Sequence, residues 1–151
     1  MKILSKNKRA YFDYEFSKFF DAGIVLLWHE VKSIKTHHVN ITESLARLEW
    51  RELFLKNMDI PLYQKTTPRL APNYQAKRSR KLLLNKAEIG KIAGLLDKPG
   101  NVLVALEVFI NKKWLIKIKL WVGKLKRKVE KKQLLKEKDI KRQMDKDMKN
   151  Y

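Results

Sequence analysis

Residues 20–44, FDAGIVLLWHEVKSIKTHHVNITES, form the stretch that decides the fold. The apolar run over residues 22–27 contains Gly23, and this pattern predicts a buried strand whose glycine allows another backbone to approach closely. The next segment, Trp28–Lys35, is polar and basic with apolar residues three positions apart, which predicts a short helix. A second strand is expected to begin near Ser44. This succession is typical of a small β-barrel that keeps one polar face for a ligand.

The length and composition limit the kinds of protein that this chain can be. A chain of 151 residues is expected to form one domain, and its net charge of +19 predicts a polyanionic partner. Nucleic acid is the first candidate and an anionic membrane is the second. The absence of cysteine excludes disulfides and thiolate metal sites. No apolar run approaches the ~20 residues of a membrane span, and the N-terminal segment lacks the apolar core of a signal peptide, so we expect a cytoplasmic protein.

Alternating apolar and polar residues predict the remaining strands on both sides of the central stretch. Residues 1–9 are basic and the first few of them are expected to be loose, whereas residues 10–16 are expected to form a half-buried strand. The strands expected after the central stretch cover residues 46–51, 52–60, 101–110 and 114–122. In the last of these, Trp114 and three further apolar residues alternate with lysines, so the lysines are expected to face outward.

Two segments between the expected strands have other patterns. Residues 64–76 contain two of the four prolines, which predicts a loop. Residues 77–96 follow a period close to 3.6, which predicts a helix that residues 97–100 end. Three successive leucines over residues 82–84 cannot all face the core from one narrow helix face. One of them is therefore expected to point outward, where it could make an apolar contact with RNA.

The composition changes at Lys124 and stays strongly basic to Tyr151, without glycine or proline. Blocks of like charge predict a tail that is disordered alone. Ile140, Met144 and Met148 recur every four residues, so the same tail can become a helix against a surface. We therefore expect an RNA-binding domain over residues 1–123 and a tail over residues 124–151.

Motifs for enzyme chemistry are essentially absent. The three histidines have no recognised metal-ligand spacing, and there is no nucleophile motif, glycine-rich phosphate loop or telling pair of carboxylates. No catalytic residue, cofactor or metal is expected. Lysines and arginines placed on phosphates release counterions and give strong, salt-sensitive binding. The basic residues near 8–9, 32–35 and 77–81 could form one such face, although on residue type alone Lys8 and Arg9 are better interpreted as a solvated strand entry.

Several short motifs resemble the SmpB family, whose members bind transfer-messenger RNA (tmRNA) and rescue stalled bacterial ribosomes. The resemblance covers residues 6–149. The matching motifs are Asn7-Lys8-Arg9-Ala10, Ala22-Gly23-Ile24, Glu30-Val31-Lys32-Ser33, Asn40-Ile41 with Ser44, and Arg80-Lys81-Leu82-Leu83-Leu84. The chain looks like a divergent member, because Trp28 and His37 stand where the family usually has glycine.

The resemblance implies an OB-type closed antiparallel β-barrel of about six strands, with two or three flanking helices and a basic tail. It implies a monomer whose barrel binds the tRNA-like domain of tmRNA. It also implies a tail that forms a helix on the ribosome, against small-subunit rRNA at the decoding site and along the empty mRNA channel. The positions that match the family's RNA-binding residues are Asn7, Asp21 and Leu83. With the basic residues and motifs around them, the RNA-binding residues expected in the barrel are Asn7, Lys8, Arg9, Asp21, Gly23, Lys32, Lys35, Asn40, Arg78, Arg80, Lys81 and Leu83. The ribosome-contacting residues expected in the tail are Lys126, Arg127, Lys128, Glu130, Lys131, Lys132, Lys141 and Arg142.

Two other functions remain open from the sequence. One is a ribosomal or other structured-RNA-binding protein with an OB barrel and no role with tmRNA. The other is a peripheral membrane protein anchored by an amphipathic tail, but the apolar face of the tail lacks the tryptophan or phenylalanine typical of such anchors.

Overall fold

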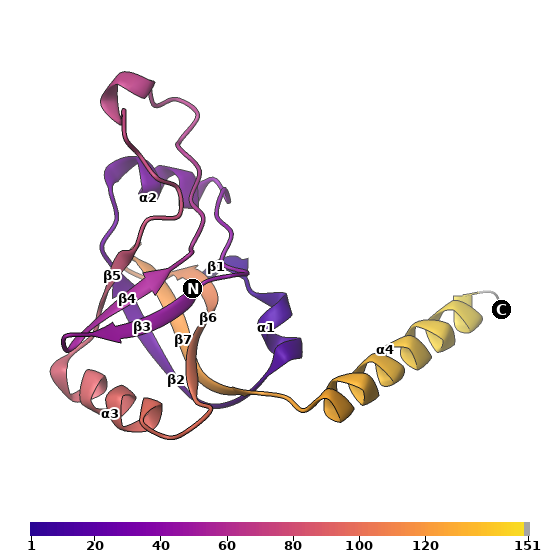
Figure 1. The fold of residues 1–151 in the computed structure, drawn as a ribbon. Helices are drawn as coiled ribbons and strands as arrows, with labels where there is room; N and C mark the ends of the chain where they lie inside the picture. The colour runs from indigo at the N-terminus through magenta and orange to yellow at the C-terminus, as the bar shows by residue number, and fades with distance from the viewer. Residues whose placement is uncertain (150–151) are drawn as a thin grey trace.

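Antiparallel strands make up most of the body of the protein, and helices flank it (Figure 1). The structure, a computed structural model, describes residues 1–149, and for residues 68 and 128–130 it describes only the backbone. The elements in chain order are β1 (Lys2–Lys6), α1 (Lys8–Asp13), β2 (Tyr14–Ile24), α2 (Trp28–Lys35), β3 (Leu45–Glu49), β4 (Glu52–Lys56), the short 3-10 helix η1 (Pro68–Leu70), β5 (Arg80–Leu83), α3 (Lys86–Leu96), β6 (Val102–Ile110), β7 (Ile116–Leu125) and α4 (Lys128–Lys149).

Six strands close into a ring in the order β6, β3, β4, β5, β2 and β7, because β7 pairs again with β6. The seventh strand, β1, extends the edge of β6 beyond β3. Residues 103–104 of β6 pair with β3, and residues 107–110 of the same strand pair with β1. All of these pairings are antiparallel, so the expected mainly-β class is confirmed.

The core fills the inside of the ring with aliphatic side chains. Leu53, Leu82 and Ile118 come from three different strands and are fully or almost fully buried. Ile34 of α2 and Ile92 of α3 are also fully buried and belong to the same cluster. Figure 1 shows α2 above the ring and α3 below it. Each such side chain contributes about 1.5–3 kcal/mol through the removal of apolar surface from water.

Several predictions from the sequence are confirmed. The helix Trp28–Lys35 has the expected bounds, and residues 64–76 form a loop that contains only η1. Strands β6 and β7 lie within a few residues of the expected ranges. On β7, Ile118 and Leu120 are buried while Lys117 and Lys119 face outward and are partly exposed, as the alternation predicts.

The N-terminal predictions are wrong. Lys2–Lys6 is a strand on the edge of β6 and is not loose, and Lys8–Asp13 is a helix where a strand was expected. The Asn7 side chain caps this helix, because its oxygen accepts a hydrogen bond from the Ala10 amide (3.1 Å). Ala10 then packs against Val104 on the outside of β6. Tertiary contact and capping therefore override the apparent alternation over residues 10–16.

The long helix expected over residues 77–96 is also wrong in its first half. Arg80–Leu83 is strand β5, and the helix begins only at Lys86. Asn85 caps that helix by accepting a hydrogen bond from the Glu88 amide (2.8 Å). One leucine does point outward, since Leu83 is 51% exposed, but the alternation of a strand causes this.

Several strand ends differ from expectation. Strand β2 stops at Ile24, β4 stops at Lys56, and Trp114 lies in a turn instead of inside β7. Trp50 also lies in a turn, where it is 98% exposed. At its far end, β7 continues to Leu125, which pairs with Tyr14, so the ring extends two residues past the expected boundary at residue 123.

Helix α4 projects away from the ring (Figure 1). It begins at Lys128, three residues after β7 ends. The prediction that this tail is disordered in free solution and folds only on the ribosome stays a prediction.

Candidate nucleic-acid interface

Three of the predicted RNA-binding residues lie together on the outer surface of the ring. Asp21 and Gly23 of β2 stand opposite Lys119 and Lys117 of β7, and Gly23 also stands opposite Leu83 of β5. Side chains of directly opposed residues lie on the same side of a sheet. The next pair along these strands joins two aromatic residues. We call the set Phe19, Asp21, Gly23, Leu83, Lys117, Lys119 and Trp121 the β2–β7 face.

Charged groups lie next to aromatic rings on the β2–β7 face. The Asp21 carboxylate is exposed and has no ion pair within the described part of the chain. The Lys119 ammonium lies 5.2 Å from the centroid of the Phe19 ring, whose own centroid is 5.0 Å from that of Trp121. The face therefore offers an unpaired acceptor, cations and aromatic surface at adjacent positions.

Gly23 sets the distance between β2 and β5 on this face. A Cβ atom at Gly23 would lie 3.3 Å from the Cβ of Leu83, which is tighter than most such contacts. The close backbone approach predicted from the sequence is therefore present, and it leaves the Leu83 side chain half exposed over the gap.

Helix α2 carries two more predicted RNA-binding residues, Lys32 and Lys35, and both are exposed. The Lys32 ammonium lies 5.3 Å from the ring centroid of Trp28 and 5.8 Å from that of Tyr63, which holds it over apolar surface. Asn40 follows the helix, and its side-chain oxygen accepts a hydrogen bond from the Thr42 amide (2.9 Å). Asn40 is thus exposed but already shapes a turn.

Arg80 has a structural role in the folded chain. Its side chain is fully buried, and its Nε atom donates to the Glu30 carboxylate (2.7 Å). Its other nitrogens donate to the carbonyl oxygens of Met58 (2.6 Å) and Ala76 (2.9 Å) and to the Tyr74 hydroxyl (3.1 Å). Because these groups occupy the buried guanidinium, Arg80 is not exposed for the RNA contact that the sequence predicted.

Glu30 is the centre of this buried network. Besides Arg80, it accepts hydrogen bonds from Arg78 and from the amide of Leu27, the residue just before α2 (2.8 Å). Burial alone would raise the pKa of the Glu30 carboxyl, but the hydrogen bonds from Arg78, Leu27 and Arg80 outweigh it and lower the pKa. Burial and the negative charge of Glu30 raise the pKa of Tyr74 to about 12. The network ties α2 to the loop that precedes β5.

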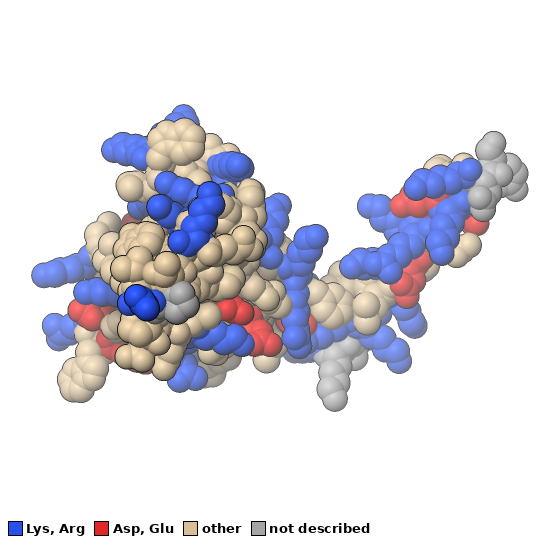
Figure 2. Space-filling model, turned by 90° about the horizontal axis from the view of Figure 1, so that it is seen from above, with Lys and Arg blue, Asp and Glu red and all other residues tan. Residues whose placement is uncertain are grey.

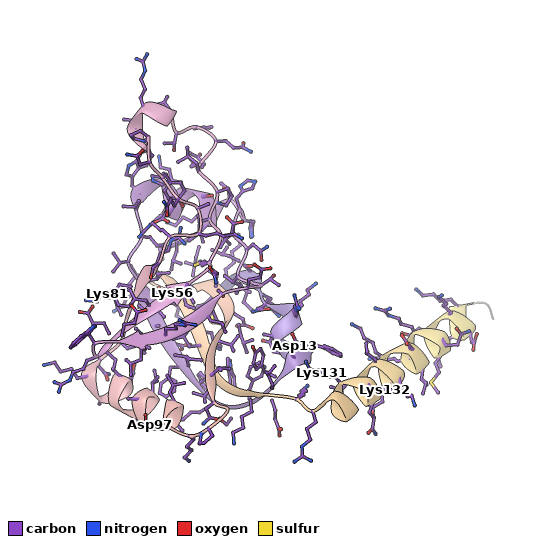
Figure 3. The ribbon with its side chains drawn as sticks, viewed as in Figure 1. Asp13, Lys56, Lys81, Asp97, Lys131 and Lys132 are labelled. Atoms are coloured by element: carbon purple, nitrogen blue, oxygen red, sulfur yellow. The ribbon has the colours of Figure 1, made fainter. Side chains whose placement is uncertain are left out.

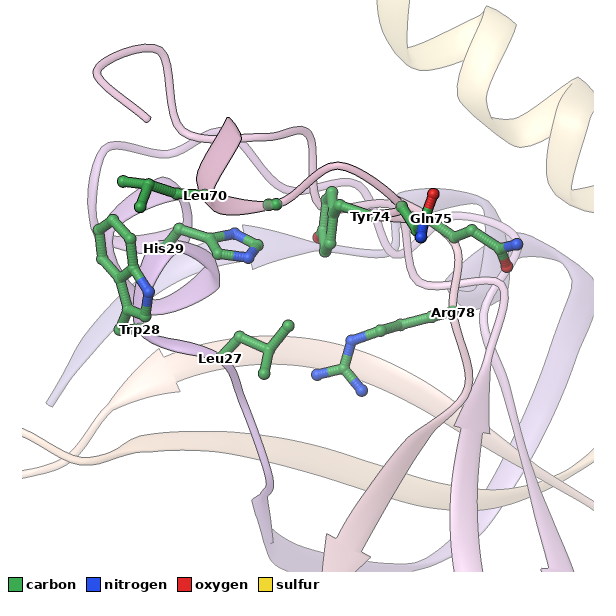
Figure 4. Close-up of a pocket in the computed structure, with 9 residues that line it drawn as sticks. Leu27, Trp28, His29, Leu70, Tyr74, Gln75 and Arg78 are labelled. Carbon is green, nitrogen blue, oxygen red and sulfur yellow. The ribbon is translucent and has the colours of Figure 1, made fainter. Parts of the chain in front are cut away.

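A hollow of about 410 Å³ opens beside this network, between α2 and the loop after η1 (Figure 4). Trp28, Leu70 and Tyr74 supply most of its apolar wall, and Arg78 borders it. His29 also lines the hollow; it is 3% exposed, its ring meets Tyr74 edge to face, and its Nδ1 atom has no hydrogen-bond partner in the described structure.

The remaining predicted residues of the ring lie elsewhere. Asn7 is buried, and its amide donates to the carbonyl oxygens of Ile41 and Ala105 (both 3.2 Å), so it joins α1 to the ring. Lys8 and Arg9 are exposed on α1. Lys81 is exposed on β5 and pairs with Glu52 (3.1 Å). Basic side chains lie around the body and along the tail and do not gather in one patch in Figure 2.

Comparison with known proteins assigns the family. The family model described as SmpB protein matches residues 4–150. The chain is 41% identical over 144 residues to the SsrA-binding protein of Coprothermobacter proteolyticus, with 95% of each chain covered. It is 38% identical to that of Bacillus subtilis, with 95% of this chain and 90% of the relative covered.

The chain belongs to the SmpB family. A solved structure described as "tmRNA-SmpB: a journey to the center of the bacterial ribosome" has the same fold, with a TM-score of 0.68 and 35% identity. That similarity covers 87% of this chain and 93% of the solved one. The family match spans the ring and α4 alike, so both parts of this SmpB-family protein belong to the matched unit.

The tail of this family member carries the other predicted contacts. Arg127, Lys132, Lys141 and Arg142 are exposed, and Lys126 is partly exposed. The Lys131 ammonium lies 3.4 Å from the Asp13 carboxylate of α1, and Figure 3 labels this pair together with Lys132. The side chains of Lys128 and Glu130 lie outside the described residues, and their roles stay predictions.

The two turn positions that depart from the family's usual glycine behave differently. His37 follows α2 with φ of 64°, the left-handed conformation that glycine adopts most easily. Trp28 is simply the first residue of α2. The turn after the helix therefore keeps a glycine-like backbone even though the residue is histidine.

Sequence reasoning missed the buried Glu30 network and the aromatic part of the β2–β7 face. The outward position of Trp121 could have been predicted from the sequence, because alternate residues of a strand face the same side and Trp121 follows Lys117 and Lys119 at this spacing. The position of Phe19 was not, because β2 changes register between Phe16 and Lys18. The described residues contain no group of three or more potential metal-binding side chains and no helix long and apolar enough to cross a membrane.

Proposed function

We propose that this chain binds tmRNA and delivers it to stalled ribosomes for trans-translation. The ring would hold the tRNA-like domain of tmRNA, and the tail would enter the empty mRNA channel of the small subunit. The observation that carries this proposal is the family match over residues 4–150, which includes ring and tail, together with relatives named SsrA-binding proteins.

We propose that the ring is an OB-type closed barrel, and its architecture supports the proposed function. Six antiparallel strands follow one another around an apolar core, and such barrels present a curved face and loops to oligonucleotides. The β2–β7 face is the part of that surface where three of the predicted RNA-binding residues lie together. Asp21 could accept hydrogen bonds from base edges or 2′-hydroxyls, and Lys117 and Lys119 could neutralise phosphates beside it.

The tail supports the second half of the proposal. Helix α4 is basic and exposed, and its described apolar side chains, among them Ile140 and Met144, have little to pack against on this chain. A helix of this kind gains stability from an anionic groove, and the mRNA channel walled by rRNA is one. We propose that the protein acts as a cytoplasmic monomer without catalytic activity, and that tmRNA and small-subunit rRNA are its partners.

The test is to purify the full-length protein from its own cells and sequence the RNA that remains bound. We expect tmRNA to be the most enriched species, and Asp21→Arg to reduce that enrichment. Enrichment of ribosomal RNA without tmRNA would instead identify a general structured-RNA-binding protein. Flotation of the protein with anionic vesicles in the absence of RNA would identify a membrane-binding protein, and either result would overturn the proposal.

A further inference from the structure

The turn between β6 and β7 has an unusual residue at its third position. Asn111 and Leu115 flank a three-residue loop, and the Asn111 amide donates to the Leu115 carbonyl oxygen (3.0 Å). The Asn111 side-chain oxygen accepts hydrogen bonds from the Lys113 amide (2.9 Å) and the Leu115 amide (3.0 Å). The Trp114 amide donates to the Asn111 carbonyl oxygen (3.0 Å). Backbone groups and Asn111 therefore hold the turn.

Trp114 occupies the left-handed position of this turn, with φ of 64°. Three-residue hairpin loops normally place glycine there, because a Cβ atom makes this conformation unfavourable. No contact of the Trp114 side chain offsets that strain within the described part of the chain. It is 75% exposed, and its indole makes no hydrogen bond and no ring contact with the other described residues. Because the fold does not require this strained residue, Trp114 is a candidate for a role outside the fold, and its surroundings on the surface decide which role.

The indole stands beside the β2–β7 face. Trp114 and Leu115 line a hollow of about 330 Å³ together with Gly23, Leu83 and Lys117, three residues of that face. Leu83 and Leu115 are each more than half exposed there. The hollow therefore joins a large aromatic surface to Leu83, which the family resemblance matches to RNA contact, and to Gly23 and Lys117 beside it.

We propose that Trp114 is a stacking platform for an unpaired base of the RNA bound on the β2–β7 face. This inference rests on the proposed function, since it names a residue of the same RNA site. The positive charge around Trp114 favours RNA over a protein partner. Lys112 and Lys113 precede Trp114 in the turn, and Lys117 borders the hollow. The whole chain carries a net charge of +19. Aromatic side chains flanked by cations are the recurrent way in which proteins hold unstacked bases of RNA.

The first test compares Trp114→Gly and Trp114→Phe with full-length wild-type protein in binding to the isolated tRNA-like domain of tmRNA. Glycine suits the left-handed turn, so Trp114→Gly is expected to unfold at the same temperature as wild type or higher. It is expected to bind the RNA about tenfold more weakly, since one base–aromatic stack has that order of effect. Trp114→Phe is expected to retain most of the affinity.

Trp50 provides a matched control. It lies in the turn between β3 and β4 with φ of 51°, is 98% exposed, and does not line the hollow. Trp50→Gly is therefore expected to leave affinity for the RNA unchanged. Wild-type affinity in a folded Trp114→Gly variant would overturn the proposal, and so would an equal loss in Trp50→Gly. Failure of the wild-type protein itself to bind the RNA would instead overturn the proposed function.

The second test observes the indole directly. The chain contains four tryptophans, so 5-fluorotryptophan labelling gives four fluorine signals that single substitutions can assign. Addition of the tRNA-like domain is expected to shift the Trp114 signal and to leave the Trp50 signal in place. A Trp114 signal that does not move when the RNA saturates the protein would contradict stacking, even if the substitutions reduced affinity.

Discussion

The ring and helix α4 differ in where their apolar side chains lie. Inside the ring, residues such as Leu53 and Ile118 are completely buried, whereas Ile140 and Met144 of α4 are more than half exposed. Burial of apolar surface stabilises folding in water, and a helix that buries little is marginal even at this length. The ring therefore contains its own source of stability, and the tail needs a second surface to supply one.

The two regions meet at a small junction. The Lys126 amide donates to the Asp13 carbonyl oxygen (2.9 Å), and the Lys131 ammonium reaches the Asp13 carboxylate of α1. Strand β7 continues to Leu125 and α4 begins at Lys128. The chain can therefore be divided after residue 127 without cutting either element. This junction allows each region to be changed without cutting into the other.

Removal of residues 128–151 should have the largest functional effect. We expect this truncated protein to unfold cooperatively at nearly the wild-type temperature, because the ring and its core remain complete. We expect tagging of a stalled nascent chain in a purified translation system to be lost, because the basic helix that would occupy the mRNA channel is gone. Wild-type tagging by the truncated protein would contradict the division between ring and tail.

Replacement of the buried carboxylate should have the largest effect on stability. Glu30→Gln leaves the fully buried Arg80 guanidinium without its counter-charge, which costs about 3–5 kcal/mol. The matched control is Glu137→Gln on exposed α4, which is expected to change the free energy of unfolding by less than about 0.5 kcal/mol. Urea unfolding of both variants measures the difference. Equal stabilities would mean that the Glu30 network does not hold the ring and the loop together.

The same carboxylate makes stability depend on pH. The pKa of Glu30 is lowered in the folded protein, so the unfolded chain binds the proton more readily and stability rises with pH in this range. The contribution is complete above the ordinary value of 4.5 and is lost as the pH falls from 4.5 through the lower pKa of the folded state. Unfolding free energies from neutral to acidic pH should show this loss in wild type and in the protein without residues 128–151. Glu30→Gln should lack it, and an identical pH profile in that variant would contradict the assignment.

A charge reversal on the β2–β7 face should affect RNA binding and leave stability unchanged. Asp21→Arg removes an exposed acceptor, and we expect affinity for the tRNA-like domain to fall about tenfold or more. Asp97→Arg introduces the same change in charge at the end of α3, where Figure 3 labels it, and should not weaken binding. Filter binding at several salt concentrations tests both. Unchanged affinity in folded Asp21→Arg would exclude Asp21 from the RNA site.

The smallest effect is expected at the junction. Lys131→Gln removes the ion pair to Asp13, a partly exposed bond worth about 0.2–1 kcal/mol, and should loosen the first turn of α4. Lys132→Gln removes the same charge from the neighbouring residue, which does not contact Asp13. Amide hydrogen exchange in the free protein should become a few-fold faster over that turn in Lys131→Gln alone. Equal exchange in both variants would show that Asp13 does not anchor the tail.

Local patterns predicted the parts of the fold that depend on local forces. The short helix α2 and the alternation along β7 followed directly from the order of apolar and polar residues. Strand β5 did not, because three leucines in a row suit a helix or a strand equally, and only pairing with β4 and β2 decides between them. The Asn85 and Glu88 spacing was the available signal for the true start of α3.

Only the site residues that lie in family motifs could be predicted from the sequence. Asp21, Gly23 and Leu83 came from the family resemblance, and the structure places them on one face. The burial of Arg80 could not be inferred from a basic run, because its partners Glu30 and Met58 lie far away in the chain. The same holds for Trp114, since the hollow beside it forms only when three strands meet.

The most direct test of the division between ring and tail is the affinity of residues 1–127 and of the full-length protein for the tRNA-like domain across a salt series. We expect the full-length protein to bind somewhat more tightly at low salt, because the tail adds non-specific phosphate contacts. We expect the difference to disappear at high salt, because screening removes those contacts while the shape-dependent contacts of the ring persist. A large loss of affinity by residues 1–127 at high salt would place the primary RNA site in the tail and contradict the account.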